Sequence, residues 1–267
     1  MSFKGIDPNT SKFHFLDSLL TPFSEIKDDE KENTKMNPKK AWLVQTDSFY
    51  ENWAYIGRTW YYHKYAKNLN EFIGEILADN LDVPTAHYEP AYRSGKLMIR
   101  TPDFRVPNHT YMTLYQLQPK YKKTTFQDFI SLLNLDRESI LNVLKMFAID
   151  IYMRQPDRSN VNILFKIHKG TKKVSFAKIF DYTNGFDRDY RVYDNAILSM
   201  EMTREDVYKK LSNFPEFFSY LDTLSHLDML KLLRSWCLRY GFNITKEIED
   251  YYQKEDEISK QIIKEIR

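Results

Sequence analysis

The most constraining feature of this sequence is an apolar helix pattern that ends at a proline and runs directly into a polar loop. Residues 136–154 carry apolar side chains at helical spacing, Asp136 is suited to cap the first turn, and Pro156 ends the pattern. The next residue is Asp157, and Asn162 follows it by five positions. A helix this apolar has to be buried, so we expect it to anchor the polar loop to the core of the fold.

The segment after the loop is expected to return a second carboxylate to the same place. Residues 162–166 and 174–180 have the composition of short strands, and Gly170 lies between them in a turn. A hairpin over these residues would bring Asp181 beside Asn162. A simpler interpretation remains open, in which the first Asp caps a loop and the second begins an ordinary turn.

Two carboxylates and a carboxamide in this order suit phosphoryl transfer from ATP. The reaction needs a group that orients the attacking hydroxyl, and hard oxygen ligands that hold Mg²⁺ against the phosphate oxygens. We therefore predict Asp157 as the catalytic base, and Asn162 and Asp181 as the metal ligands.

The same residues resemble HipA-like serine/threonine kinases. The run from Gln155 to Asn162, followed by Ile179-Phe180-Asp181, is similar to the D-R-x-x-x-N and D-x-x pair of that family, although Ser159 stands where relatives often have His. The Arg after the catalytic Asp is shared with phosphatidylinositol kinases. The resemblance implies an α+β, two-lobed protein-kinase-like fold, with a small β-rich N-lobe and a mainly helical C-lobe. It also implies ATP and Mg²⁺ as cofactors and a protein Ser or Thr as the acceptor.

An aromatic segment in the N-terminal half provides a candidate for the phosphate-binding lysine of such a fold. Residues 59–65 are β-prone, and alternation places Lys64 on one face with Trp60 and Tyr62. We predict Lys64 as the ATP-contacting lysine, with Lys67 as the weaker alternative.

The helix predicted over residues 70–80 resembles the segment of HipA-like proteins that is equivalent to the kinase C-helix. Glu71 aligns with the acidic position of that segment, and Glu75 lies one turn further along the same face. We predict Glu71 as the partner of Lys64 and keep Glu75 as the alternative. Both glutamates could equally be ordinary surface charges.

Two further parts of an ATP site have weaker signals. Strands predicted at 96–101 and 111–117 would lead into a connector between lobes, where the main chain of Tyr115, Gln116 and Leu117 would bind the adenine edge. Side chains say little about such a connector, because recognition there uses main-chain groups.

The phosphate-covering loop has no glycine-rich motif, since the chain has only 7 Gly among 267 residues. The best candidate is the stretch 46–52, between strands predicted at 41–45 and 53–57. Ser48 lies in this stretch, and it is the residue to inspect for the autophosphorylation that the resemblance implies. Because this motif is missing, a pseudokinase stays an alternative interpretation of the sequence.

The sequence predicts three regions: an appendage with a charged linker over 1–40, an N-lobe over 41–118 and a C-lobe over 119–267. The apolar stretch 13–23 would dock on the body or bind a partner, and docking is favoured. Helices are expected at 125–130, 203–211, 215–224, 227–240 and 246–266.

Composition limits the partners. The balance of 39 basic and 37 acidic residues gives a formal charge of +2, so no nucleic-acid binding is expected. Cys237 is the single cysteine, which precludes an internal disulfide, and its apolar setting predicts a buried thiol. No apolar run is long enough for a membrane span, and no signal-peptide pattern is present. We expect a cytoplasmic protein, and the sequence does not exclude delivery into a host cell by a route without a signal peptide. The oligomeric state is left open.

Three rival functions remain. A small-molecule kinase of the aminoglycoside or choline type shares the three polar groups but usually has His before the catalytic Asp, where Pro156 stands. A lipid kinase would share the Asp-Arg pair but is generally larger. A non-catalytic pseudokinase would have no chemical need for the metal ligands. The identity of a protein substrate cannot be read from the sequence.

Overall fold

The structure, a computed structural model, describes most of the chain. The described residues are 20–22, 51–56, 59–65, 68–93, 96–117, 133–155, 158, 162–186, 211 and 213–266. The chain forms two compact units, each built from separate segments. The first unit comprises Met1–Leu69, His87–Phe104 and Leu230–Tyr251, and the second comprises Asn70–Ala86, Arg105–Met229 and Tyr252–Arg267. Each unit is described by itself, and the region boundaries predicted at residues 40 and 118 stay predictions.

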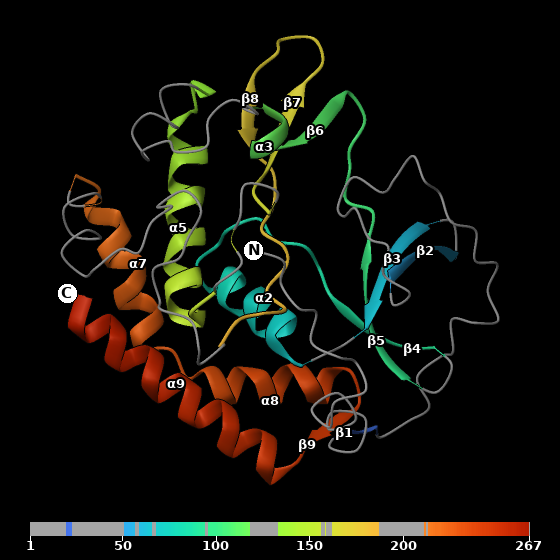
Figure 1. The fold of residues 1–267 in the computed structure, drawn as a ribbon, viewed down its shortest axis with the longest axis vertical. Coiled ribbons are helices and arrows are strands. Elements are labelled where there is room, and N and C mark those ends of the chain that lie inside the picture. Colours follow the sequence, from blue (N-terminus) through green and yellow to red (C-terminus); the bar gives the residue numbers. More distant parts are fainter. Residues whose placement is uncertain are drawn as a thin grey trace, which may run out of the picture. The chain divides into compact units, whose positions relative to one another are not determined.

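The first unit contains a four-stranded antiparallel sheet with the order β2-β3-β5-β4 (Figure 1). Its strands are β2 (Glu51–Ile56), β3 (Thr59–Tyr65), β4 (Glu89–Arg93) and β5 (Lys96–Pro102). The strand β3 has the bounds that its aromatic alternation predicts. β4 was not predicted, and it lies at the sheet edge, where a strand tolerates a proline such as Pro90. The strand predicted at 41–45 lies outside the described residues.

A second, two-stranded sheet in the first unit joins a segment from the N-terminal part of the chain to one from the C-terminal part. β1 (Leu20–Pro22) pairs antiparallel with β9 (Phe242–Ile244), and Leu20 lies opposite Ile244. The docking predicted for the apolar stretch 13–23 is therefore observed for these three residues of it. Strand β9 itself was not predicted, because three residues are too few to show a periodic pattern.

The second unit is organised around α5 (Arg137–Met153), which the structure buries on almost every side after its first turn. Its Asp136 cap was predicted and is observed: the carboxylate accepts from the Ser139 N–H at 2.9 Å. The helix packs against α7 (Pro215–Ser225), α2 (Asn70–Asn80) and the strand β8 (Val174–Phe176) (Figure 1). Burial on all these faces explains the unbroken apolar pattern of its sequence.

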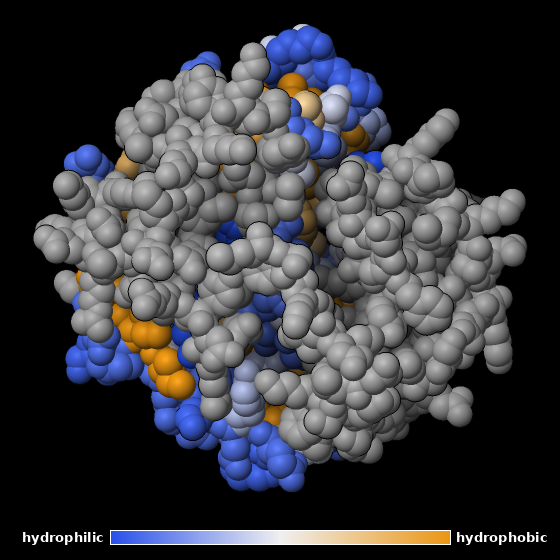
Figure 2. Space-filling view, viewed as in Figure 1, coloured by the Kyte–Doolittle hydropathy of each residue, from blue (hydrophilic) through white to orange (hydrophobic). Residues whose placement is uncertain are grey.

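The hairpin predicted after the polar loop is present in the second unit. β7 (Leu164–His168) pairs antiparallel with β8 (Val174–Phe176), and β6 (His109–Thr113) pairs with the other edge of β7. Hydrophilic residues gather over the tip of the hairpin (Figure 2), where the exposed run from Lys169 to Lys173 joins the two strands. The hairpin leads the chain back toward Asp181.

The strand predicted over 111–117 is wrong in its second half, because the strand ends at Thr113. The next four residues form the short helix α3 (Leu114–Leu117). The Gln116 side chain accepts from the Thr113 N–H at 2.9 Å, and the Gln116 N–H donates to the Thr113 hydroxyl at 3.3 Å. This reciprocal pair is a capping box, which starts a helix directly after a β-prone strand.

The C-terminal helices agree closely with their periodic patterns. α7, α8 (Met229–Arg239) and α9 (Lys246–Ile266) are observed, with α9 at its predicted bounds. The Cys237 thiol is buried in α8, and burial raises its pKa to about 12, which makes it unreactive as a nucleophile. Among the described residues, no helix has the length and apolarity that a membrane span requires. The helices predicted at 125–130 and over most of 203–211 lie outside the described residues.

Candidate active site

The segment that leads to Asp181 is fixed to the chain that leaves helix α2. Thr85 and Ile179 form a parallel β-bridge, in which the Ile179 N–H donates to the Pro84 carbonyl and the Ala86 N–H donates to the Ile179 carbonyl, both at 2.8 Å. The Val-Pro ending of the predicted helix segment therefore has a structural role. It sets the position of Asp181 relative to α2.

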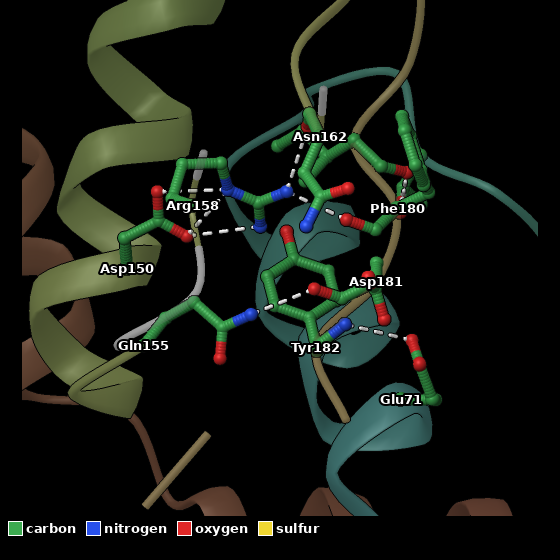
Figure 3. Close-up of polar contacts among 10 residues, drawn as sticks. Glu71, Asp150, Gln155, Arg158, Asn162, Phe180, Asp181 and Tyr182 are labelled. Carbon is green, nitrogen blue, oxygen red and sulfur yellow. Dashed lines mark hydrogen bonds and ion pairs between the residues drawn. The ribbon is translucent and has the colours of Figure 1, made fainter. Parts of the chain in front are cut away.

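Arg158 lies at the centre of the candidate site and has no exposed surface (Figure 3). Its guanidinium donates to the carboxylate of Asp150 on α5 at 3.0–3.2 Å. The Nη1 group donates to the main-chain carbonyls of Asn162 at 3.0 Å and Phe180 at 2.6 Å. One side chain thus joins the helix, the polar loop and the segment before Asp181.

The charge of Arg158 is secured by its partner. Burial alone would lower the pKa of Arg158, but the carboxylate of Asp150, together with smaller contributions from Tyr182 and Asp181, raises that pKa above its ordinary value. The guanidinium also lies over the Tyr182 ring, 5.2 Å from the ring centre, which adds a cation–π contact. A charged Arg with a buried carboxylate partner can therefore persist inside the unit.

Asp181 has a left-handed backbone, with φ of 62°, that is held by hydrogen bonds on both sides. Its carbonyl accepts from Gln155 Nε2 at 2.7 Å, and the next main-chain N–H, that of Tyr182, donates to Glu71 Oε2 at 2.9 Å. The Arg158 bond to Phe180 fixes the preceding carbonyl. Left-handed backbone costs a non-glycine residue about 1 kcal/mol or more, so it persists only where surrounding contacts impose it.

Gly74 in the middle of helix α2 makes room for Tyr182. A Cβ at position 74 would lie 2.1–2.5 Å from ring atoms of Tyr182, which is completely buried. A glycine inside a helix costs roughly 0.5–1 kcal/mol relative to alanine. The buried aromatic ring offsets this cost, because it packs directly on the helix backbone. Burial also raises the pKa of Tyr182 well above its ordinary value, so the phenol stays neutral.

The turn after Asp181 is held by the first residue of helix α2. Asn70 Nδ2 donates to the carbonyl of Gly185 at 2.5 Å and to that of Thr183 at 3.2 Å. The Asn70 carbonyl oxygen in turn accepts from the Tyr252 hydroxyl of α9 at 3.0 Å. Helix α2 therefore contacts the Asp181 segment at both its first residue and its centre.

Among the predicted catalytic residues, Asn162 and Asp181 are described and Asp157 is not. The chain segments of Asn162 and Asp181 are brought together by Arg158, as the hairpin predicts. Both side chains are partly exposed, so a ligand could reach them. Asp157 lies outside the described residues, and so does Ser48. The roles assigned to all four stay predictions.

The predicted ATP-binding residues fall in different parts of the chain. Lys64 lies on β3 of the first unit, opposite Ile99 and Glu51 in the sheet, whereas Glu71 belongs to the second unit and is fully buried. The Glu71 carboxylate accepts from the Tyr182 N–H and from the Thr183 hydroxyl, the latter at 2.6 Å. Its predicted role as partner of Lys64 is untested.

The connector residues Tyr115, Gln116 and Leu117 lie in helix α3 and not in an extended segment. The Gln116 N–H is already bonded to Thr113, so it is less available to an adenine edge. Their role as main-chain ATP contacts stays a prediction.

The donor set fits the magnesium ion that the resemblance implies. Mg²⁺ in phosphotransferases takes one or two carboxylates together with phosphate and water oxygens. Asp181 supplies a carboxylate, which accepts from the Thr183 hydroxyl at 3.3 Å, and Asn162 supplies an amide oxygen. In the described ranges, no cluster of three or more His, Cys, Asp or Glu side chains offers a different kind of metal site.

Sequence reasoning missed three residues of this site: Asp150, Gln155 and Gly74. Asp150 had the clearest signal, since it is an acid inside an otherwise apolar stretch of helix. A carboxylate at such a position needs a buried partner. The other two had no local signal, because their contacts are made with residues far along the chain.

Comparison with known proteins shows which solved structures are similar to this chain. No family model and no curated protein matches the sequence. Among solved structures, the proinflammatory kinase CtkA of Helicobacter pylori matches with a TM-score of 0.51 and 15% identity, over 91% of this chain and 94% of that chain. HipA of Shewanella oneidensis MR-1, solved with HipB and operator DNA as a toxin–antitoxin complex, matches with a TM-score of 0.63 and 12% identity, over 87% of this chain and 70% of that chain.

The fold of the chain is similar to that of these two solved structures. At these identities the likeness concerns the fold alone. It agrees with the predicted mixture of helices and small sheets, whereas the division into two kinase lobes stays a prediction.

Proposed function

We propose that this chain is a kinase that transfers a phosphoryl group from ATP, with Mg²⁺, to a serine or threonine hydroxyl of a protein. The observation that carries the proposal is the double contact of Arg158 with the carbonyls of Asn162 and Phe180. It holds the two segments that bear the proposed metal ligands, Asn162 and Asp181, at one place in the second unit.

In this proposal each polar group has a defined task. Asp157 orients the acceptor hydroxyl and receives its proton, while the acceptor oxygen forms a bond to the γ-phosphorus and the bond from that phosphorus to the ADP oxygen breaks. Asn162 and Asp181 would hold Mg²⁺, and Lys64 would contact the phosphates. ATP would supply the phosphoryl group, and Mg²⁺ would neutralise charge on the phosphate oxygens.

Glu71 receives a second task in addition to the predicted pairing with Lys64. Its carboxylate accepts from the Tyr182 N–H and the Thr183 hydroxyl, which connects helix α2 to the residues after Asp181. A shift of α2 along its axis would then disturb the metal-binding segment. We therefore include α2 in the active site as a positioning element.

One sequence feature favours a protein acceptor over a small molecule. Pro156 stands where small-molecule kinases of the aminoglycoside or choline type usually carry histidine. Two of the matching solved structures are named as a proinflammatory kinase and as the HipA of a toxin–antitoxin system, and these names state no acceptor. Neither observation identifies the substrate, so the acceptor has to be found by experiment.

The proposal is tested with radiolabelled ATP, Mg²⁺ and a generic protein substrate, comparing wild type with Asp157→Ala and Asp181→Ala. We expect label on protein with wild type, and a loss of about 10²–10⁴-fold in transfer for Asp157→Ala. Asp250→Ala is the matched control, because Asp250 is an exposed residue of α9. Wild type that binds ATP without labelling protein would point to a metabolite acceptor, and wild type that does not bind ATP would refute the proposal.

A further inference from the structure

Asp150 is a carboxylate in a place where an apolar helix would normally have none. It lies on the buried part of α5, with 2% of its surface exposed, between Ile149 and Ile151. Burying a carboxylate is costly unless a partner compensates it. The partner is Arg158, whose Nε and Nη2 groups both donate to it.

The remaining N–H groups of Arg158 do not serve the ion pair. Nη1 donates to the carbonyls of Asn162 and Phe180, and these two residues are one of the proposed metal ligands and the neighbour of the other (Figure 3). The orientation of the guanidinium plane therefore sets the distance between the two segments. Asp150 fixes that plane by contacting two of its nitrogens.

Charge provides a second, independent reason for Asp150. The Arg158 guanidinium donates to the carbonyl of Phe180, the residue directly before Asp181, so its charge acts on the segment that carries the Asp181 carboxylate. An uncompensated cation there would compete with a divalent metal for the Asp181 carboxylate. Asp150 cancels the charge of Arg158, which leaves the Asp181 carboxylate available for the metal.

We propose that Asp150 is a positioning residue of the active site, which holds Arg158 so that Asn162 and Asp181 meet at the spacing and net charge that Mg²⁺ requires. This inference rests on the proposed function. It predicts that loss of the Asp150 carboxylate weakens metal binding more than does a substitution elsewhere that lowers the free energy of unfolding by the same amount.

The chain contains a matched control for the experiment. Arg154 at the end of the same helix forms an ion pair with Glu255 of α9, and both side chains are buried. Glu255→Gln removes a buried carboxylate from an arginine, as Asp150→Asn does. Glu255 pairs with Arg154, whereas it is Arg158 that joins the Asn162 and Asp181 segments, so loss of the Glu255 carboxylate should affect stability without affecting the metal site.

The measurement is Mn²⁺ binding, followed by electron paramagnetic resonance in the presence of a non-hydrolysable ATP analogue, together with analogue binding in the absence of metal. We expect Asp150→Asn to weaken Mn²⁺ binding by about 10–100-fold, as is typical when the support of a metal ligand is lost. Metal-free binding of the analogue should stay unchanged. Glu255→Gln should bind Mn²⁺ as wild type does.

Arg158→Lys keeps the inference testable if Asp150→Asn does not fold. Lysine preserves the charge opposite Asp150, but its single nitrogen cannot contact the carboxylate and both carbonyls together. We expect a folded protein with weakened Mn²⁺ binding. Normal Mn²⁺ binding by Arg158→Lys, or equal Mn²⁺ binding by Asp150→Asn and Glu255→Gln, would overturn the inference while the proposed function stands. A wild type that binds the analogue with no Mn²⁺ would overturn both.

Discussion

The two ends of helix α5 use the same kinds of charged groups in opposite surroundings. At the first turn, Asp136 caps the helix and pairs with Lys173 at 2.7 Å, and both side chains face solvent. Near the last turn, Asp150 pairs with Arg158, and these two side chains are excluded from solvent. The exposed end stabilises one helix locally, whereas the buried end orders three separate segments. The difference shows that an ion pair orders more of the structure where water cannot replace either partner.

The largest effect is expected from breaking a buried pair. Asp150→Asn leaves the Arg158 charge without its carboxylate inside the unit, which typically costs about 3–5 kcal/mol. Equilibrium urea unfolding would measure the loss in the free energy of unfolding. Glu255→Gln should give a loss of the same order, because it removes the same kind of partner. A loss below about 1 kcal/mol in both variants would erase the contrast between the two ends of the helix.

The next effect concerns packing beside the buried end. Gly74→Ala would drive a methyl group into the Tyr182 ring, and overpacking of this kind costs about 1–3 kcal/mol although alanine favours helix. Thermal unfolding checks the prediction. Gly170→Ala, at the exposed hairpin tip, is the control and should change the melting temperature far less. Stabilisation by Gly74→Ala would show that the ring does not need the space.

At the exposed end, Asp136→Ala should cost about 1 kcal/mol through loss of the helix cap. The Lys173 ammonium and the Ser139 N–H lower the pKa of Asp136 to about 2, from an ordinary value of 3.8. The ionised group therefore stabilises the fold fully above about pH 4, and this contribution is lost as the pH falls through 2. Asp136→Asn retains a capping oxygen and does not titrate, so its stability should lack this acid-dependent part. Identical acid unfolding profiles for wild type and Asp136→Asn would show that the ionised Asp136 carboxylate is not the source of this acid-dependent stability.

The smallest effect is expected for Lys173→Ala. The lysine is exposed, and an exposed ion pair contributes little because water and salt screen it. Urea unfolding should give no measurable change at physiological ionic strength. A clear loss that disappears at high salt would show that the exposed pair matters more than its surroundings suggest.

Regular elements could be predicted from the sequence because their signals are local. Helices α2 and α9 and strand β3 have the bounds that periodicity gives. Strand β9 was missed because it has only three residues, and β4 because it contains Pro90, which a strand tolerates only at a sheet edge. Helix α3 was missed because it follows directly on a β-prone strand and starts at a capping box.

The site was predictable in part for the same reason. The return of Asp181 toward Asn162 follows from a hairpin, which is a local feature. The contacts of Glu71 with Tyr182 and of Gly74 with the same residue span more than a hundred positions. No pattern in a single sequence encodes such contacts, so only the structure reveals that Tyr182 needs a glycine on α2.

The hydrogen bond from Tyr252 to Asn70 has a consequence for the order in which the molecule is made. It joins residues 182 positions apart, and Asn70 is the residue that holds the turn after Asp181. During translation α2 and α5 emerge long before α9, and a contact can form only after both of its residues have been synthesised. The turn beside Asp181 therefore gains its last support near the end of synthesis. A nascent chain stalled before residue 252 would carry the Asn162 and Asp181 segments without that support.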